Sequence, residues 1–552
     1  MANRYWVGGT GTWDSFTTTQ WSATSGGAGG ASVPTSADSV FFNSASSATA
    51  YTVTYSSGVT IGPVSFAQPA SGNFTFLATS SSSNLSIGGN ITIASGVVFG
   101  YDGTITIRGN GSTVATIIVS GGGALNNCSF VIDIGIYSVG GLKLLSNLNV
   151  KSLVLTKGTL NLNLYYLVTN TFNTNSTSTR DIDFGSGAYI QIQGTSGTVF
   201  NAYSVTNLTL TGTPNIFFLS GTAYSTRTII AEGGNATSFN FSIAQGPLYS
   251  IVELPSTVRN LSFVGCSSTV YWYSNLSIFG NVTLGTTATF SSAFSWWFSS
   301  PTTTRTLTTS GKTISWPVWI TATSASYTAL QLADNFTSTS YIYLTSGGLD
   351  TNSKAVSVPI FQIAGPSIQL LALGTTTLSL SAAGATGGAT GTASAWDNAG
   401  AGTLTITGTG TINLTSASAK IFKGGSFAGY PKLNQGGAGA LTVTGSNGFT
   451  NITNTVQPAS VLFTAGTTNT FTAFSLSGTA GNLITINSDT AADHYLALTT
   501  SSNPTVNYCN IDYSSVVLVG AGKKWVALNS VNGGHNTNWQ FGVSRGSMML
   551  LF

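Results

Sequence analysis

Short alternations of apolar and polar residues run along almost the whole of this 552-residue chain. Leu85 and Ile87, for example, are separated by a small polar residue, and Leu404 and Ile406 repeat the pattern far downstream. A period of two predicts half-buried β-strands. The runs end at Gly, Asn or Ser, which tolerate the backbone conformations of tight turns. Since no segment shows a 3.6-residue period with helix caps, we predict an all-β fold.

The alternating runs belong to internal repeats. Residues 84–99 read NLSIGGNITIASGVVF, residues 275–290 read NLSIFGNVTLGTTATF, residues 147–160 read NLNVKSLVLTKGTL, and residues 344–358 hold a looser copy. One such unit cannot bury its inward side chains alone, whereas stacked units form a continuous core. We therefore predict an elongated parallel β-helix, or β-solenoid, with turns of ~20–25 residues. Tandem β-sandwich domains remain the alternative, because the offsets between the Asn-Leu motifs do not exclude them.

A second repeated motif places an arginine after Ser and Thr residues. Arg180, Arg227 and Arg305 each follow such residues and precede an apolar alternation. We expect each arginine to lie at the beginning of a strand.

The ends of the chain differ in composition from the repeats. We divide the chain into an N-terminal Trp/Gly-rich cap or attachment segment (1–60), a repeat-containing solenoid (61–382), a Gly/Ala-rich break (383–403), a C-terminal solenoid segment (404–541) and an apolar tail (542–552). The clustered Trp6, Trp13 and Trp21 are interpreted as a β-rich cap on the first turn or as a surface that docks on a partner. The tail is predicted to pack on the protein itself or to dock on another protein through Met548, Met549, Leu550, Leu551 and Phe552.

The composition narrows the classes of function. Charged residues make up 6% of the chain, against roughly 25% in ordinary soluble domains. An apolar content of 42% argues against disorder of the whole chain. The net charge of +3 is spread without any Lys/Arg cluster, so no nucleic-acid partner is predicted. Weak charge repulsion favours self-association.

The cysteines and the N-terminus give expectations about cofactors and location. Cys128, Cys266 and Cys509 lie far apart without metal or redox spacing, so we interpret them as small buried apolar residues. No metal and no cofactor are predicted. The N-terminus lacks the pattern of a signal peptide, and no apolar run is long enough to span a membrane. We therefore expect synthesis in a cytoplasm and no membrane span.

Carboxylate pairs are the main candidates for chemistry, because glycoside hydrolysis uses two of them. Asp181 and Asp183 would lie on one face of a strand, next to Arg180, and they could form a small acidic site. We interpret them as outward polar residues. No Ser-centred nucleophile motif and no phosphate-binding loop occurs in the required context.

Two further groups of side chains are weaker candidates. Asp489, Asp493 and His494 lie in a turn-like stretch, where Asp commonly bonds to its own backbone, and His535 is interpreted as a turn residue. Trp296, Trp297, Trp316 and Trp319 could stack on sugar rings if exposed, but we interpret them as core residues. No catalytic residue is assigned.

Several segments resemble a known group of proteins. The C-terminal part, from QGGAGALTVTGSNGFTNITNT to NYCNIDYSSVVLVGAGKKWVALNSVNGGHNTNWQF, resembles phage-encoded, repeat-rich tail-fibre or virion proteins. The N-terminal RYWVGGTGTWD and VPTSADSVFF resemble the beginnings of the same proteins, and are also similar to autotransporter-type β-strand repeats. The resemblance implies a right-handed β-helix or related fibrous fold, usually trimeric, in a virion appendage without catalytic residues. The ending RGSMMLLF has no counterpart in that pattern.

Together these observations predict a non-enzymatic bacteriophage structural protein located in the virion. It would be a homotrimeric tail fibre or appendage that contacts other virion proteins and attaches to a host glycan or protein receptor. Two alternatives stay open: a polysaccharide-depolymerising tailspike, and a capsid-decorating fibre or bacterial surface adhesin with the same fold.

Overall fold

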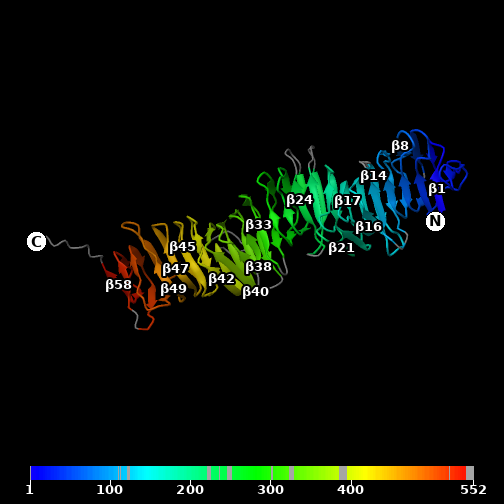
Figure 1. Cartoon of the computed structure of the whole chain (residues 1–552). Helices are drawn as coiled ribbons and strands as arrows, with labels where there is room; N and C mark the ends of the chain where they lie inside the picture. Colours follow the sequence, from blue (N-terminus) through cyan, green and yellow to red (C-terminus); the bar gives the residue numbers. More distant parts are fainter. Residues whose placement is uncertain are drawn as a thin grey trace. The chain divides into compact units, whose positions relative to one another are not determined.

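A computed structural model describes residues 2–56, 58–109, 111, 113–120, 125–219, 226–234, 237–244, 251–299, 303–322, 328–383, 394–520 and 523–542. The described residues form β-strands, turns and irregular segments (Figure 1). In this part of the chain, no helix is long and apolar enough to cross a membrane. The chain divides into two compact units: Met1–Tyr273 with Thr287–Ser291, and Ser274–Thr286 with Ser292–Phe552.

The first unit is built from rows of parallel strands in which each strand comes from the next turn of the chain. One row contains β1 (Ala2–Trp6), β4 (Asp38–Phe42), β7 (Val64–Phe66), β10 (Ile91–Ile93), β13 (Ala115–Val119), β15 (Gly141–Leu144), β16 (Leu148–Asn161), β18 (Arg180–Asp183) and β21 (Leu208–Thr211). A second row contains β6 (Thr60–Ile61), β9 (Asn84–Ile87), β12 (Thr104–Ile107), β14 (Leu125–Asp133), β16, β17 (Tyr166–Asn173), β19 (Tyr189–Ile192), β22 (Asn215–Leu219), β24 (Asn240–Ala244) and β27 (Leu261–Ser262).

The first unit also contains two shorter rows. They are β2 (Gly11–Trp13), β5 (Tyr51–Tyr55), β8 (Phe74–Ala78) and β11 (Val98–Phe99), and then β17, β20 (Gly197–Ala202), β23 (Thr226–Ala231), β25 (Ile251–Glu253), β28 (Thr269–Tyr271) and β31 (Thr289–Ser291). The register aligns Val40 with Val64, Val64 with Ile91, and Ile91 with Ile117, and all four are buried. Like residues therefore form ladders inside the coil, which is the core that a single turn could not make.

Tryptophan rings fill the core at the beginning of the first unit. Trp6 pairs with Trp21 where β1 meets β3 (Trp21–Ser22) in an antiparallel arrangement. The ring centroids of Trp6 and Trp21 are 5.2 Å apart, as are those of Trp13 and Trp21. All three rings are 0% exposed. They belong to the core, as the capping interpretation requires. Docking of a partner on this segment stays a prediction, and the buried rings themselves would not form its contact surface.

The second unit repeats the parallel arrangement. One row contains β29 (Leu276–Ile278), β32 (Trp296–Phe298), β35 (Val318–Thr321), β38 (Ile342–Asp350), β40 (Phe361–Gly374), β42 (Trp396–Gly408), β44 (Lys420–Lys423), β46 (Leu441–Thr444), β48 (Ala459–Phe463), β50 (Ile484–Ser488), β53 (Cys509–Ile511) and β56 (Val531–Asn532). A short row joins β30 (Val282–Thr283), β33 (Arg305–Thr308) and β36 (Thr328–Leu332) to β38.

An eleven-stranded sheet forms another face of the second unit. Its strands are β34 (Thr313–Ile314), β37 (Phe336–Ser338), β39 (Val356–Val358), β41 (Thr377–Leu380), β43 (Thr411–Leu414), β45 (Tyr430–Gln435), β47 (Gly448–Asn454), β49 (Thr468–Ser475), β51 (His494–Leu498), β54 (Ser514–Val517) and β57 (Asn536–Thr537). The last turns also hold β52 (Thr505–Asn507), β55 (Trp525–Leu528) and β58 (Trp539–Gly542). Leu378, Ile412, Leu433 and Ile452 follow one another in register and are buried.

The predicted β-solenoid is confirmed, and the tandem β-sandwich alternative is wrong. In a sandwich the sheets would be antiparallel, whereas here each turn lies parallel to the next. The repeats 84–99 and 275–290 each supply three short strands, β9–β11 and β29–β31. Residues 396–403 of the stretch that was predicted to be a break, 383–403, belong to β42 and pair with β40.

Neutral side chains supply the outer coat of the solenoid. On the first unit the Asn240 amide donates to Asn215 at 2.9 Å, and the Asn260 amide donates to Asn240 at 2.8 Å. Each asparagine comes from the next turn, so the amides form a hydrogen-bonded ladder. Such ladders satisfy polar groups between successive turns without ion pairs.

Candidate functional site

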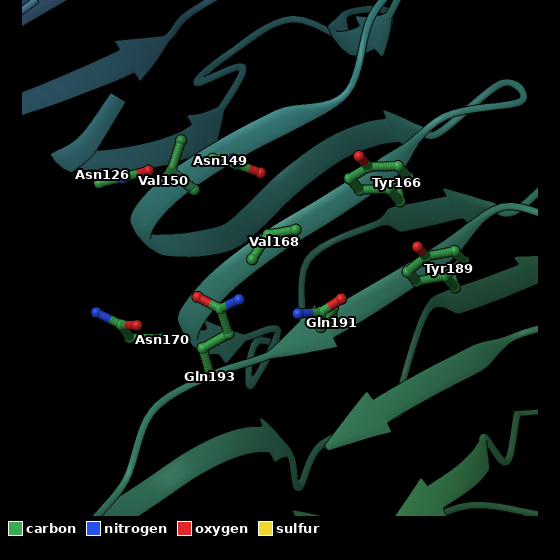
Figure 2. Close-up of a pocket in the computed structure, with 9 residues that line it drawn as sticks. All are labelled: Asn126, Asn149, Val150, Tyr166, Val168, Asn170, Tyr189, Gln191 and Gln193. Atoms are coloured by element: carbon green, nitrogen blue, oxygen red, sulfur yellow. The ribbon is translucent and has the colours of Figure 1, made fainter. Parts of the chain in front are cut away.

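A hollow of about 520 Å³ lies on the first unit, over strands β14, β16, β17 and β19 (Figure 2). We name it the amide groove. It is lined by Asn126, Asn149, Val150, Tyr166, Val168, Asn170, Tyr189, Gln191 and Gln193. Figure 2 shows the two tyrosines at one end of the groove and most of the amide side chains at the other.

The parallel register brings these residues together from separate turns. Asn149 of β16 pairs with Val168 of β17, and Val168 pairs with Gln191 of β19. Tyr166 likewise pairs with Tyr189. Side chains of parallel partners point to the same face, so each turn contributes one member to each row of the groove.

The five amide side chains of the groove are not engaged by the protein. None of those of Asn126, Asn149, Asn170, Gln191 and Gln193 has a hydrogen-bond partner among the residues that the structure describes. The asparagine ladder at Asn215 and Asn240 is different, since its amides bond to one another. The groove therefore concentrates free donors and acceptors, because each amide can donate through nitrogen and accept through oxygen.

Two stacked tyrosine rings line one end of the groove. The ring centroids of Tyr166 and Tyr189 are 5.2 Å apart and the planes differ by 11°. The ring of Phe217 contacts that of Tyr189 edge-on, with ring centroids 5.0 Å apart and planes that differ by 78°. These contacts restrict the rings, so a ligand meeting them would cost little further side-chain ordering.

The chemistry of the groove suits binding and not hydrolysis. None of its nine lining residues carries a charge. Glycoside hydrolysis by the usual route needs a carboxylic acid and a carboxylate beside the bond, and the lining residues supply neither. Free amides and phenols match the hydroxyl groups of an uncharged, polyhydroxylated ligand.

The predicted acidic pair is on the outer face, as expected from its spacing. Asp181 and Asp183 are half-buried, and Arg180 between the two turns is 0% exposed. The Asp183 carboxylate accepts hydrogen bonds from the Asn161 amide at 3.0 Å and the Thr211 hydroxyl at 2.9 Å. Successive residues of a strand point to opposite faces, so Arg180 does not join the two carboxylates. The pair acts as a hydrogen-bond acceptor between neighbouring turns.

Arg180 instead occupies the interior corner of its turn. Its guanidinium donates to the carbonyl oxygens of Ser178 at 3.0 Å, Thr206 at 2.7 Å and Ser204 at 3.2 Å, and also to the carbonyl of Thr174. Burial lowers the pKa of Arg180. The repeated Ser/Thr-Arg motif thus marks strand beginnings, as predicted, and at this copy the arginine satisfies corner carbonyls.

The second predicted cluster is also structural. His494 is 0% exposed, its Nδ1 lies 3.3 Å from the Ser488 hydroxyl, and its ring packs 4.9 Å from Phe463. Burial lowers the pKa of His494 to about 4. Asp493 accepts a hydrogen bond from Ser515 at 2.6 Å. Asp489 accepts a hydrogen bond from the backbone N–H of Ala465 at 3.0 Å. Each of the three predicted side chains thus has a contact within the fold.

His535 lies in the last turns, on the surface. Its Nδ1 is 3.0 Å from the Asp512 carboxylate, and its ring stacks on Tyr513 at 4.1 Å. Hydrogen bonds from His535 and backbone groups lower the pKa of Asp512. The turn interpretation of His535 agrees with this position.

The four tryptophans of the second unit divide into two pairs. Trp296 and Trp316 are buried, with ring centroids 4.8 Å apart, as the core interpretation predicted. Trp297 and Trp319 are half-buried on the outer face, and their rings stack at 4.9 Å and 13°. The core interpretation is wrong for this second pair, because neighbouring residues of a strand point to opposite faces.

The cysteines are all buried thiols without a disulfide, as predicted. Burial raises the pKa of Cys128 and of Cys509. Among the described residues, no group of three or more His, Cys, Asp or Glu side chains could hold a metal ion. The predicted docking residues Met548, Met549, Leu550, Leu551 and Phe552 lie outside the described residues.

The amide groove was not predicted from the sequence. Its residues alternate along NLNVKSL, YLVTNT and YIQIQ, and the only available signal was polar amides at outward positions of successive repeats. No family model, curated protein or solved structure matches the chain. The residues of the groove and the fold that aligns them are therefore the features that bear on function.

Proposed function

We propose that this chain is a non-enzymatic bacteriophage appendage protein, a tail fibre that attaches to a host through an uncharged surface glycan. The β-solenoid supports this role, because stacked parallel turns hold a binding surface rigidly. The observation that carries the proposal is the amide groove: five unengaged amides and two stacked tyrosines surround one hollow without a charge. The trimer implied by the resemblance stays a prediction.

The ligand class follows from the lining. Amides that donate and accept recognise hydroxyl groups, and the aromatic rings cover apolar ring faces. A charged polysaccharide would find no counter-charge among the lining residues. Binding should therefore depend weakly on salt, in contrast to a site that relies on ion pairs.

The experiment is a titration of the full chain with neutral oligosaccharides, with Asn149→Ala and Gln191→Ala as test variants. Each variant should weaken binding about ten-fold, the effect of losing roughly 1–1.5 kcal/mol of hydrogen bonding. Asn510→Ala is the matched control, because Asn510 is half-buried in β53 and does not line the groove. Equal binding by both groove variants and the wild type would contradict the proposal.

The depolymerase alternative is not favoured. The carboxylates of Asp181 and Asp183 already accept hydrogen bonds from neighbouring turns, donated by Thr159, Asn161 and Thr211. The amide groove provides no second carboxylate. The capsid-decorating and adhesin alternatives share the glycan-binding surface and differ from the proposal only in the particle or cell that carries it.

A further inference from the structure

One strand of the second unit has an open side. On one side, β42 pairs with β40 from Trp396 opposite Phe361 to Gly408 opposite Gly374, with register shifts on either side of the Gly400–Ala401 pairing and again before Gly408. On its other side, β44 pairs only with Trp396 and Asp397. Among the residues that the structure describes, no strand pairs with residues 400–408 on that second side. We name residues 400–408 the open edge.

The open edge exists because the following turn is shorter. After β44 the chain reaches β45 through residues 424–429, without a strand equivalent to residues 400–408. The row that continues through β36, β38 and β40 therefore ends at β42. Alternate residues of a terminal strand direct their N–H and C=O groups away from the sheet, where they can pair with another strand.

Burial confirms that the open edge lacks cover. Leu371 of β40 is 0% exposed, whereas its register partner Ile406 is only half-buried. Gln369 is also 0% exposed, and its partner Leu404 is half-buried. The side chains that would face the core in a continuing row thus form an apolar rim along the open edge.

The sequence of the open edge is symmetric in its pattern. Residues 402–408 read GTLTITG, which is the same in both directions when Leu and Ile are treated as equivalent. If two copies pair antiparallel about Thr405, Leu404 lies opposite Ile406 of the second copy, and Thr403 lies opposite Thr407. Apolar side chains then meet on one face and threonines on the other, which is the self-complementarity that a two-fold interface requires.

The absence of charge also favours a second copy of this chain as the partner of the open edge. The sequence holds no charged residue between Asp397 and Lys420, so two copies meet without repulsion and an acidic or basic strand finds no counter-charge. Exposed edges are usually protected by Lys, Pro or a bulge. Residues 402–408 contain neither Lys nor Pro. Between Thr403 and Gly408 the register shift falls in β40, between Ala372 and Gly374, and not in the open edge.

We propose that the open edge is a self-association site, at which two copies of this chain pair antiparallel about a two-fold axis through Thr405. The site lies in the second unit and does not depend on glycan binding by the amide groove. It predicts an even-numbered assembly, and it therefore departs from the trimer that the resemblance implies.

The first test measures the mass of the full chain by light scattering after gel filtration. The wild type should elute at twice the chain mass. Thr405→Lys and Thr405→Glu each place two like charges across the axis and should each elute at the chain mass, whereas an equimolar mixture of the two should return to the dimer mass. Thr92→Lys is the matched control, because Thr92 is exposed on β10, which has partners on both sides; it should remain dimeric.

A wild type at the chain mass would overturn the proposal. So would an oligomer whose mass is unchanged in Thr405→Lys, or a mixture of the charge variants that stays monomeric.

A second test uses disulfide cross-linking, which does not require the charged variants to fold. Thr405→Cys places two thiols opposite each other, since antiparallel partners lie about 4.5–5.5 Å apart between Cα atoms, within the range of a disulfide. Under mild oxidation it should give a covalent dimer on a non-reducing gel. Thr92→Cys controls for random collision, and the three native cysteines are buried. Equal cross-linking of the two variants would overturn the proposal.

Discussion

The interior guanidinium of Arg180 offers a sharp test of how the turns are held together. Arg180→Met keeps much of the aliphatic volume but removes the donors that reach Ser178 and Thr174 in one turn and Ser204 and Thr206 in the next. Each buried carbonyl left without a partner costs ~1–3 kcal/mol. Removal of a buried charge recovers part of that loss, so the net destabilisation expected is about 3–5 kcal/mol.

The assay combines urea unfolding with hydrogen exchange. Stacked turns can unfold locally, so exchange should accelerate first in peptides that cover residues 174–180 and 204–208. Arg108→Met is the control: its ion pair with Asp133 spans 3.2 Å between side chains that are 41% and 31% exposed, and its loss should cost less than about 1 kcal/mol. If Arg180→Met unfolds at the same urea concentration as Arg108→Met, the carbonyl contacts do not stabilise the turns as argued.

Two further predictions concern the buried histidine and the outward carboxylates. His494 titrates at about 4 in the folded chain against 6.5 as its ordinary value, so the unfolded chain binds the proton first as pH falls. Stability from this site is present above pH 6.5 and is lost between 6.5 and 4, by up to about 3 kcal/mol; urea unfolding of His494→Gln should lose that pH dependence, and an unchanged slope would refute the assignment. The double variant Asp181→Asn and Asp183→Asn should keep oligosaccharide affinity and leave polysaccharide size unaltered. Cleavage by the wild type that this variant lacks, measured by gel filtration of the polysaccharide, would establish the depolymerase alternative.

The β-solenoid could be predicted from the sequence because its turns repeat one sequence pattern. Period-two runs such as Leu85 to Ile87, separated by Gly-containing corners, predict short strands, and repeated copies predict stacking. The inward or outward direction of single residues was less accessible. Trp296 and Trp297 are neighbours, and only the register of their strand decides that the first is buried and the second lies on the outer face.

The amide groove and the open edge could not be predicted from the sequence, for a related reason. The groove needs Asn149, Val168 and Gln191 to lie side by side, and the alternation within each strand does not specify how far one turn is shifted against the next. The open edge arises because one turn is shorter than its predecessor. A pattern in one segment cannot reveal the absence of its partner in the following segment.

The most direct test of the account is a crystal structure of the chain with a bound neutral oligosaccharide. We expect parallel stacked turns, and sugar hydroxyl groups within hydrogen-bond distance of Asn149 and Gln191 with a sugar ring against Tyr166 or Tyr189. A sugar bound elsewhere with the amide groove empty, or a charged site as the only point of contact, would contradict it.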